Sequence, residues 1–321
     1  MSGFGLAEVE AAAARIAGRV HRTPLLTSTQ LDRAVGAPLL AKAEHLQRVG
    51  AFKARGAFNA LLAMGPAARA GGVIAVSSGN HAQAVALAAA ETGTSALIVM
   101  PEGSNPAKLA ATRAYGAEVL SEGIAAAERE TVVRALAAAR GLRLVHPFDD
   151  EDVMAGQGTA ALELLADAGQ GSIDAVLVPV GGGGLLSGTA AAVKGLAPAV
   201  RVIGVEPAAA ADARASLRAG HRVALPAPPV TLADGVRAQV VGERPFAVIS
   251  RLVDDIVTVS EDELLAALAL VWSRTKQLIE PSAALPVAAL LAGAVQPRPA
   301  RPAVILSGGN VDAAALAATL G

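Results

Sequence analysis

The sequence predicts an α/β fold built from two open, twisted, mostly parallel sheets that are flanked by helices. Short runs of β-branched or aliphatic residues alternate along the chain with Ala-rich segments of helical length. This alternation is typical of parallel strands joined by helices that cover both faces of a sheet. At 321 residues, the chain is also long enough for two lobes, each with its own core.

The predicted strands are apolar runs bounded by glycine, proline or polar residues, and the predicted helices are the Ala-rich segments between them. Strands are expected at 39–43, 73–76, 96–100, 118–120, 142–145, 175–180, 202–205, 256–259 and 303–306. Helices are expected at 52–64, 81–92, 106–115, 125–140, 156–168, 185–196, 261–273 and 283–292. The stretch 207–245 has several prolines and little periodicity, so it is expected to be an extended excursion.

The elements divide into two groups along the chain. Residues 69–147 hold four predicted strands with three helices, enough to close on themselves as a small α/β domain. We expect this small domain to be inserted in a large domain formed by residues 1–68 and 148–321. The early strand at 39–43 and the helix at 52–64 are assigned to the large domain.

Composition excludes several classes of partner. Lys plus Arg total 27 and Asp plus Glu total 28, so the net charge is −1, and no basic stripe indicates nucleic acid or an anionic membrane. The expected partner is a small molecule. The chain has no Cys, which removes disulfides and thiolate chemistry and fits a reducing compartment, so a cytoplasmic location is expected.

The mean hydropathy of +0.48 does not indicate a membrane protein. Alanine produces most of this value, and no segment reaches the roughly 18 uninterrupted apolar residues that a spanning helix needs. The first twenty residues carry Glu8 and Glu10 where a signal peptide needs positive charge and then an apolar run. No association with a membrane is therefore expected.

Four consecutive glycines, Gly181, Gly182, Gly183 and Gly184, lie between the strand at 175–180 and the helix at 185–196. A strand, a glycine turn and a helix together direct backbone N–H groups and the positive end of a helix at an anion, usually a phosphate. A nicotinamide dinucleotide is one rival, but the fingerprint G-x-G-x-x-G fails in every register. A phosphate site is predicted at this turn.

Two further polar turns follow predicted strands. One comes after the strand at 73–76 and the other after the strand at 303–306; their residues are Ser77, Ser78, Gly79, Asn80 and His81, and Ser307, Gly308, Gly309 and Asn310. Either turn alone is compatible with plain helix capping. Open α/β sheets, however, bind ligands at the carboxyl ends of their strands. Three such turns together indicate one ligand site.

Lysine is rare in this chain, which has five lysines and 22 arginines. Only lysine can give up its proton at accessible cost and condense with an aldehyde. Lys53 lies in a Gly-rich, apolar phrase at the start of a predicted helix, which makes it a candidate nucleophile. The alternative is that Lys53 is one of a few lysines left at random by a composition that favours arginine.

Five motifs of this sequence, in this order and spacing, carry a resemblance to a known family. They are Phe52-Lys53-Ala54-Arg55-Gly56-Ala57, Ser78-Gly79-Asn80-His81-Ala82-Gln83, Gly156-Gln157-Gly158-Thr159, Gly181 to Gly184, and Ser307-Gly308-Gly309-Asn310. The chain resembles the fold type II pyridoxal-phosphate enzymes, which share the fold of the tryptophan synthase β subunit. Within them it is similar to the threonine/serine dehydratase and serine racemase family. The resemblance covers essentially the whole chain.

The resemblance implies pyridoxal 5′-phosphate as cofactor and gives each motif a role. Lys53 bonds covalently to the cofactor and serves as base at the substrate Cα, and Phe52 lies beside it. Asn80 binds the phenolic oxygen, Gly181 to Gly184 hold the phosphate, and Ser307 contacts the pyridine nitrogen. The substrate carboxylate binds the turn formed by Ser77, Ser78, Gly79, Asn80 and His81. A homodimer is also implied.

A cation site is implied at a second place. Glu206 and Asp212, with the backbone carbonyl of Ala210 between them, resemble the site at which some members of the family bind a divalent cation. Carboxylate and carbonyl oxygens suit Mg²⁺, Mn²⁺ or Ca²⁺. Two solvated acids after a strand are the alternative, because two carboxylates alone are a weak metal signal.

We expect the reaction to be the dehydration of L-threonine or L-serine to a 2-oxo acid and ammonia. The sequence 146–150 resembles the dehydratase form of the family, whereas Ser78 occupies the position of the second acid/base of the racemase. Serine racemisation and 3-hydroxyaspartate dehydration are therefore alternatives. A different class, a non-catalytic phosphate-binding protein on the same scaffold, is also left open. Val49 and Ala51 depart from the Thr and Ser usual in the lysine motif.

Overall fold

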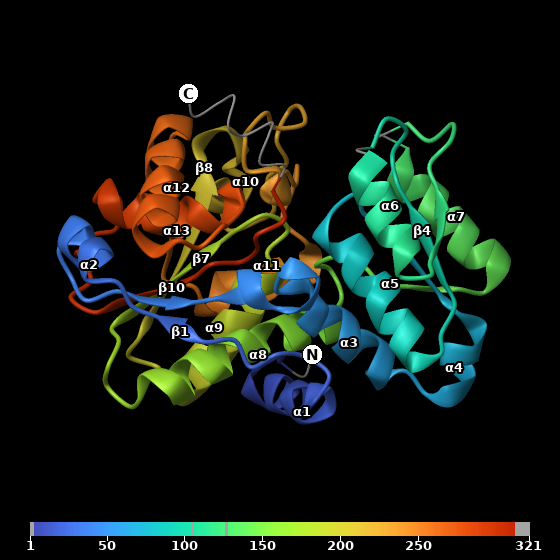
Figure 1. The fold of residues 1–321 in the computed structure, drawn as a ribbon, viewed down its shortest axis with the longest axis horizontal. Helices are drawn as coiled ribbons and strands as arrows, with labels where there is room; N and C mark the ends of the chain where they lie inside the picture. Colours follow the sequence, from blue (N-terminus) through green and yellow to red (C-terminus); the bar gives the residue numbers. More distant parts are fainter. Residues whose placement is uncertain (1–2, 105, 126–127, 312–321) are drawn as a thin grey trace.

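Two parallel β-sheets organise the chain, as a computed structural model of residues 3–104, 106–125 and 128–311 shows (Figure 1). The larger sheet has six strands in the order β1-β2-β10-β7-β8-β9. Its strands are β1 (Leu25–Leu26), β2 (Leu40–Lys42), β7 (Ala175–Pro179), β8 (Arg201–Pro207), β9 (Asp255–Val259) and β10 (Pro302–Ile305). Every pairing in it is parallel except β1 with β2.

The smaller sheet has four strands in the order β5-β4-β3-β6, and all of its pairings are parallel. Its strands are β3 (Val73–Val76), β4 (Ala96–Val99), β5 (Glu118–Leu120) and β6 (Arg143–Leu144). All four fall between β2 and β7 along the chain. The predicted fold class is confirmed, and this topology supports the inserted small domain at 69–147, whose boundaries stay a prediction.

Helices cover both faces of each sheet. They are α1 (Leu6–Ile16), α2 (Thr29–Val35), α3 (Lys53–Ala63), α4 (Pro66–Gly71), α5 (Asn80–Thr92), α6 (Pro106–Ala114), α7 (Arg129–Arg140), α8 (Glu151–Ala168), α9 (Gly184–Leu196), α10 (Asp212–Ala219), α11 (Glu243–Leu252), α12 (Glu261–Thr275) and α13 (Pro281–Leu291). Four 3-10 helices accompany them: η1 (Glu44–Leu46), η2 (Arg48–Gly50), η3 (Ala208–Ala210) and η4 (Asp234–Val236).

Each face of each sheet has its own hydrophobic core. On the larger sheet, α2, α12 and α13 pack on one face and α1, α8 and α9 on the other. On the smaller sheet, Val73 and Ala75 of β3 face the core that α3 and α5 cover, while Ile74 and Val76 face the core that α7 covers. This period of two is what a strand buried on both faces requires.

The sequence missed several helices. The stretch 207–245 is not extended throughout, because it contains η3, η4 and α10, and α11 begins within its end. In α10 the charged residues Asp212, Arg214 and Arg218 obscure a short buried face made by Ala213 and Ser216. Helices α1, α2 and α4 were also not predicted.

The helix predicted at 156–168 begins five residues earlier, at Glu151. The Asp150 side chain caps it by accepting hydrogen bonds from the N–H groups of Asp152 and Val153 at 2.9 and 3.3 Å. Two glycines in its first half had hidden the helical pattern. Of the helix predicted at 125–140, residues 126–127 lie outside the described residues, and α7 begins at Arg129.

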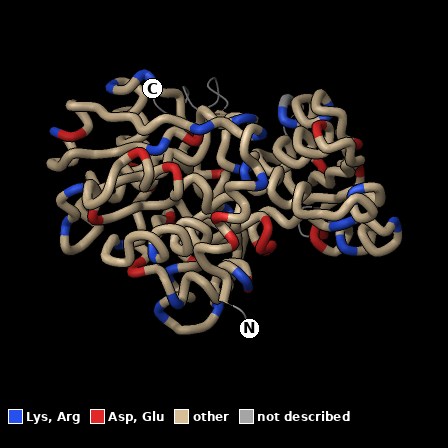
Figure 2. The backbone as a smooth tube through the Cα atoms, turned by 90° about the horizontal axis from the view of Figure 1, so that it is seen from below, with Lys and Arg blue, Asp and Glu red and all other residues tan. Residues whose placement is uncertain are grey.

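Charge is distributed evenly over the molecule. In the view of Figure 2, segments with Lys or Arg and segments with Asp or Glu are interspersed over both lobes. Within the described ranges, no helix combines the length and the hydropathy needed to cross a bilayer.

Candidate active site

The three polar turns and Lys53 meet where the two sheets face each other. Lys53 is the first residue of α3, which lies at the junction of the two lobes (Figure 1). The Phe52 N–H donates to the carbonyl oxygen of Ser307 at 3.0 Å, and Ala51 forms a β-bridge with Gly308. These bonds place the lysine motif directly beside the third turn.

The amine of Lys53 lies in a protein environment without a hydrogen-bonded carboxylate. Its Nζ donates to the carbonyl oxygen of Pro147 at 2.7 Å and lies 4.9 Å from the centre of the Phe52 ring. The residue as a whole is half-buried, but protein atoms surround the amine closely. Burial lowers the pKa of Lys53 to about 8, against the opposing effect of the Glu280 charge. A neutral, nucleophilic amine is therefore accessible near physiological pH.

Asn80, the first residue of α5, is held by a chain of hydrogen bonds. Its Nδ2 donates to both carboxylate oxygens of Glu280 at 3.1 Å, and its Oδ1 accepts from Nδ2 of Asn310 at 2.9 Å. Asn310 Nδ2 also donates to the carbonyl oxygen of Val49 at 2.6 Å. The second turn, the third turn and the lysine motif are thus tied together through Asn80.

Glu280 is a site residue that the sequence did not reveal. It is buried, and burial raises its pKa to about 7 although Asn80 donates to it. It precedes Pro281, the first residue of α13, so from sequence it is compatible with an ordinary helix start. The available signal was a single acid in the otherwise apolar stretch 278–292.

The glycine loop has the properties of an anion site. Among the described residues, no acceptor is found for the backbone N–H groups from Gly181 to Leu186. A Cβ on Gly182 would lie 2.1 Å from the Phe148 ring, and Gly183 has a φ of 89°. Only glycine fits these two positions, and the free N–H groups at the start of α9 fit the phosphate of pyridoxal phosphate.

The side chains of the second turn differ in their burial and in their hydrogen bonds. The Ser77 hydroxyl accepts from the Gly79 N–H at 3.1 Å, and the hydroxyl of half-buried Ser78 has no hydrogen-bond partner among the described residues. His81 is buried, and its Nε2 lies 2.9 Å from the carbonyl oxygen of Val145. Burial and then the Lys53 charge lower the pKa of His81 to about 3, so the ring is neutral. The His81 side chain faces the small sheet, so only the backbone of His81 contributes to the turn.

Ser307, the residue predicted to face the pyridine nitrogen, is almost fully buried at the end of β10. Its neighbour Gly308 lies against Glu280, because a Cβ there would be 2.6 Å from Oε1 of that carboxylate. The neutral hydroxyl of Ser307 and the buried carboxyl group of Glu280 therefore both lie at the third turn.

Glu206 and Asp212 form a separate buried acidic pair. The Glu206 carboxylate accepts from the N–H groups of Ala213 and Arg214 at 3.0 and 2.9 Å, whereas both Asp212 carboxylate oxygens are buried without a described partner. Burial raises the pKa values of Glu206 and Asp212 to about 8 and about 7. Within the described residues no three His, Cys, Asp or Glu side chains gather, so a cation here would also need the Ala210 carbonyl and water.

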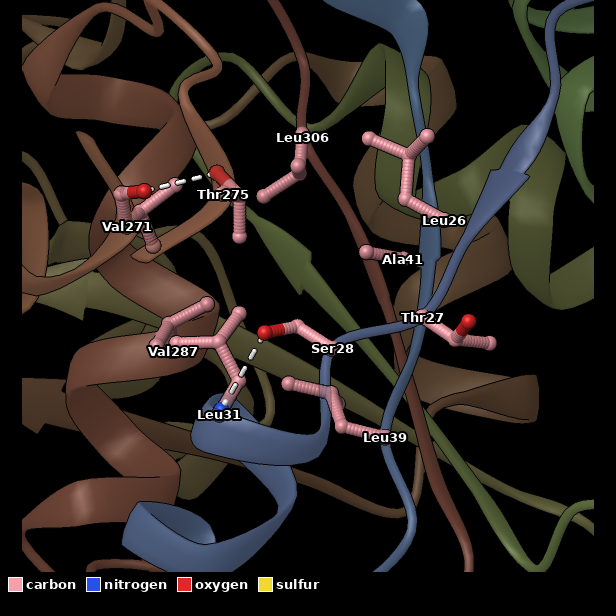
Figure 3. Close-up of a pocket in the computed structure, with 10 residues that line it drawn as sticks. All are labelled: Leu26, Thr27, Ser28, Leu31, Leu39, Ala41, Val271, Thr275, Val287 and Leu306. Carbon is pink, nitrogen blue, oxygen red and sulfur yellow. Dashed lines mark hydrogen bonds between the residues drawn. The ribbon is translucent and has the colours of Figure 1, made fainter. Parts of the chain in front are cut away.

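Two hollows lie apart from these groups. An apolar one of about 10 Å³, close to the lower limit for one water molecule, is lined by residues of β1, α2, β2, α12 and α13, including Leu26, Leu31 and Val287 (Figure 3). A polar cleft of about 500 Å³ reaches His146 and Asp149, next to the Pro147 carbonyl that accepts from Lys53. Neither contains a residue of the three turns.

A lysine whose enclosed amine hydrogen-bonds to Pro147, next to the Phe148 ring that covers the glycine loop, on mostly parallel sheets of this order, defines the class of fold type II pyridoxal-phosphate proteins. The chain belongs to the family of pyridoxal-phosphate dependent enzymes, whose family model matches residues 16–308. The predicted family, the enzyme class and the cofactor are thereby confirmed.

Individual relatives cover nearly the whole chain. L-threo-3-hydroxyaspartate ammonia-lyase of Saccharomyces cerevisiae is 47% identical over 93% of this chain and 90% of that protein. The solved threonine deaminase of T.th. is 55% identical with a TM-score of 0.91, over 96% of this chain and 99% of that one. Maize serine racemase is 37% identical with a TM-score of 0.93, over 98% and 96%.

Proposed function

We propose that this chain is an ammonia-lyase that eliminates water from L-threonine or L-serine and releases a 2-oxo acid and ammonia. The observation that carries the proposal is the Lys53 amine, which has a lowered pKa of about 8 and lies beside the turn that carries the neutral hydroxyl of Ser307. Relatives named for threonine, serine and hydroxyaspartate chemistry support the substrate class.

Bound pyridoxal phosphate supplies an aldehyde that condenses with amines and a conjugated ring that withdraws electrons from the Cα of an amino acid. In the proposed site, Gly181 to Gly184 would hold its phosphate, Asn80 would bind its phenolic oxygen and Ser307 would bind its ring nitrogen. Phe52 lies beside Lys53 and limits the approach of water to the amine.

Lys53 has two proposed tasks. Its neutral amine would hold the cofactor covalently, and once that amine is free, the same nitrogen would remove the proton from the substrate Cα. The turn from Ser77 to His81 binds the substrate carboxylate with its N–H groups and hydroxyls.

The chemistry balances as the net loss of one ammonia, because the water that is eliminated first is matched by the water that is taken up later. The Cα–H and Cβ–OH bonds break, the proton goes to Lys53 Nζ, and the hydroxyl leaves with a proton as water. The unsaturated amine that is released takes up water and loses ammonia, which gives the 2-oxo acid.

A second candidate substrate is a β-hydroxy amino acid that carries a second carboxylate, as 3-hydroxyaspartate does. The favouring observation is Lys108 of α6, which pairs with Asp234 of η4 at 2.9 Å. Burial raises the pKa of Glu280 and the Lys108 charge opposes that rise, so a cation lies near the site. The names of two relatives, 47% and 46% identical, agree with this choice.

Serine racemisation is the remaining alternative, and the free Ser78 hydroxyl favours it as an accompanying reaction. A racemase needs a proton donor on the face of Cα opposite Lys53. The Ser78 hydroxyl is half-buried and has no hydrogen-bond partner among the described residues, so its proton is available.

Glu206, Asp212 and the Ala210 carbonyl are proposed to hold a divalent cation, Mg²⁺, Mn²⁺ or Ca²⁺. The two unpartnered oxygens of Asp212 supply the support, because buried carboxylate oxygens without donors are costly unless a cation or a proton satisfies them. A homodimer is proposed from the family resemblance.

Product analysis tests the function. The protein reconstituted with pyridoxal phosphate is incubated separately with L-threonine, L-serine and L-threo-3-hydroxyaspartate, and 2-oxo acid, ammonia and D-amino acid are each measured. Equal amounts of 2-oxo acid and ammonia are expected, with little D-serine. D-Serine in large excess over pyruvate, abolished in Ser78→Ala, would establish the racemase alternative instead.

A further inference from the structure

A buried ion cluster lies behind the first turn of α3, on the side away from the cofactor site. We propose that this cluster, centred on Arg55, positions Lys53 for its reaction with the cofactor. The inference rests on the proposed role of Lys53 and concerns two motifs, Arg55-Gly56 and Gly156 to Thr159, that the proposed reaction leaves without a task.

Arg55 is fully buried, and all three nitrogens of its guanidinium group donate hydrogen bonds. Its Nε and Nη2 donate to the two carboxylate oxygens of Glu44 at 2.7 and 2.8 Å, and its Nη1 and Nη2 donate to those of Glu163 at 2.8 Å. Nη1 also donates to the Thr159 hydroxyl at 3.2 Å. Two bidentate pairs fix both the position and the plane of the guanidinium.

Lys42 and Thr23 complete the cluster. The buried Lys42 amine donates to Glu163 at 2.7 Å and to the carbonyl oxygen of Thr23 at 2.6 Å, and the Thr23 hydroxyl donates to Glu44 at 2.5 Å. Arg55 and Lys42 thus neutralise Glu44 and Glu163, and every oxygen of these two carboxylates accepts a hydrogen bond. Asp167 lies at the edge of the cluster, 3.9 Å from the Lys42 amine. The cluster ties α3 to β2, η1 and α8.

The start of α3 depends on such tertiary contacts because it has no capping side chain. Phe52 occupies the N-cap position and makes no side-chain cap hydrogen bond. Glycines hold α3 against α8, since a Cβ on Gly156 would lie 2.4 Å from the Arg55 carbonyl oxygen and one on Gly56 would lie 2.9 Å from that of Val153. The backbone between Lys53 and Gly56 is thus fixed from behind.

The geometry of the α-helix links the ion cluster to the position of Lys53. Residues two apart on an α-helix point about 200° apart, so Arg55 and Lys53 leave opposite sides of the same turn. The cluster holds one side, and Lys53 Nζ reaches the Pro147 carbonyl on the other at 2.7 Å. Because the ion cluster fixes the backbone of α3, the Lys53 amine stays enclosed and keeps its orientation. A reaction that is sensitive to shifts of about 1 Å requires such a fixed amine.

The test uses a charge-balanced double variant, Arg55→Met with Glu44→Gln, which removes one cation and one anion and leaves the Lys42–Glu163 pair intact. The matched control is Arg301→Met, the same change at an exposed arginine outside the cluster, which donates to the Gly171 carbonyl oxygen at 2.7 Å. Arg55→Lys provides a second variant if the double variant does not fold. It keeps the positive charge but loses the planar guanidinium group that makes the bidentate hydrogen bonds.

The apoproteins are mixed with pyridoxal phosphate across a pH series, reduced with borohydride, and the modified peptide is quantified by mass spectrometry. Thermal unfolding of each protein is measured in parallel. Both cluster variants are expected to modify Lys53 at least about tenfold more slowly than wild type and control. The pH midpoint of their reaction is expected to move up from about 8 toward the ordinary 10.5, because a loosened turn admits water to the amine.

A purely structural role would lower the folded fraction without moving this midpoint. The inference is overturned if the folded variants modify Lys53 at the wild-type rate with an unchanged midpoint, or if the rate falls only in proportion to the unfolded fraction. Failure of the wild-type protein to carry the cofactor on Lys53 would instead overturn the proposed function, and the two failures are therefore distinguishable.

Discussion

The chemistry of Lys53 follows from two features of its immediate surroundings. Protein atoms enclose the amine, which disfavours the charged form, and its hydrogen-bond acceptor is the neutral Pro147 carbonyl rather than a carboxylate. Glu280 acts in the opposite direction but at longer range, and burial keeps that carboxyl itself partly protonated near neutral pH. The amine consequently loses its proton more easily than an exposed lysine.

The first prediction concerns the pH dependence of cofactor attachment. Because only the neutral amine attacks an aldehyde and burial lowers the Lys53 pKa to about 8, the rate at which apoprotein binds pyridoxal phosphate covalently should rise through pH 8 and then level off. Stopped-flow absorbance across the pH range measures this. A rate that still climbs steeply toward pH 10.5 would contradict an enclosed amine, and Lys53→Arg is the unreactive control.

The second prediction concerns the buried acids Glu206 and Asp212. Their folded-state pKa values are raised, so their protonated forms stabilise the fold at low pH, and this contribution is lost as the pH rises from about 4 through about 7 and 8. A divalent cation needs the deprotonated forms and should restore stability at the high end. At 100 times its Kd, a cation adds about 2.7 kcal/mol.

Thermal unfolding with and without Mg²⁺, Mn²⁺ or Ca²⁺ checks this. The cation should raise the melting temperature clearly at pH 8.5 and little at pH 6, and the double variant Glu206→Gln with Asp212→Asn should respond at neither pH. An equal rise at both pH values, or a rise that survives in the double variant, would place the cation elsewhere.

At the scale of elements, the crossing of α3 and α8 is tightly packed close to the site. The third prediction is that Gly156→Ala, whose new Cβ would lie 2.4 Å from the Arg55 carbonyl oxygen, pushes the helices apart and destabilises the protein by about 1–3 kcal/mol. Because α3 carries Lys53, cofactor affinity should fall as well. Urea unfolding and cofactor titration measure the two effects.

Gly65→Ala is the matched control for this change. No atom lies within 4 Å of a Cβ built on Gly65, and its φ of −66° suits any residue. Its stability and cofactor affinity should equal those of wild type within about 0.5 kcal/mol. If Gly156→Ala behaves like this control, the crossing does not constrain Lys53.

Element order and type were predictable because each sheet is parallel and buried on both faces. Strands such as Ala175–Pro179 are continuous apolar runs next to glycine turns, a pattern that local sequence reveals. Helix α10 was missed because its buried face consists of Ala213, Ser216 and the charged Asp212, so charged residues hide the helical pattern. The start of α8 was missed because Gly156 and Gly158, which the α3 and α9 crossings require, weaken the helical signal.

The candidate site was predictable only where its residues lie in local motifs. The three turns and Lys53 each have a recognisable neighbourhood, and the structure brings them together. Glu280 lies 200 positions from Asn80 along the chain, and Pro147 contributes only a backbone carbonyl. Such contacts arise from tertiary folding, and no sequence pattern around either residue indicates them.

At the scale of the whole molecule, the two lobes meet across the site. Lys108 of α6 forms an ion pair with Asp234 of η4 at 2.9 Å, so it links the small sheet's lobe to the larger one. Both residues are partly exposed, and an exposed pair contributes little to stability. The Lys108 charge is therefore available to a substrate that carries a second carboxylate.

The fourth prediction is that Lys108→Met raises KM for L-threo-3-hydroxyaspartate about tenfold relative to L-threonine, which corresponds to about 1.4 kcal/mol. Threonine has no second carboxylate, so its KM should change little. Steady-state kinetics with both substrates measure the ratio, with Lys194→Met as a control far from the turns. An unchanged ratio would remove Lys108 from substrate selection.

The central claim is that Lys53 alone among the five lysines carries the cofactor. Borohydride reduction of the holoprotein, followed by proteolysis and mass spectrometry, tests it most directly and does not depend on the substrate. We predict a single pyridoxyl-modified peptide that contains Lys53, and no stable modification in Lys53→Ala. Modification of a different lysine in the wild-type protein, or full cofactor attachment and turnover in Lys53→Ala, would contradict this claim.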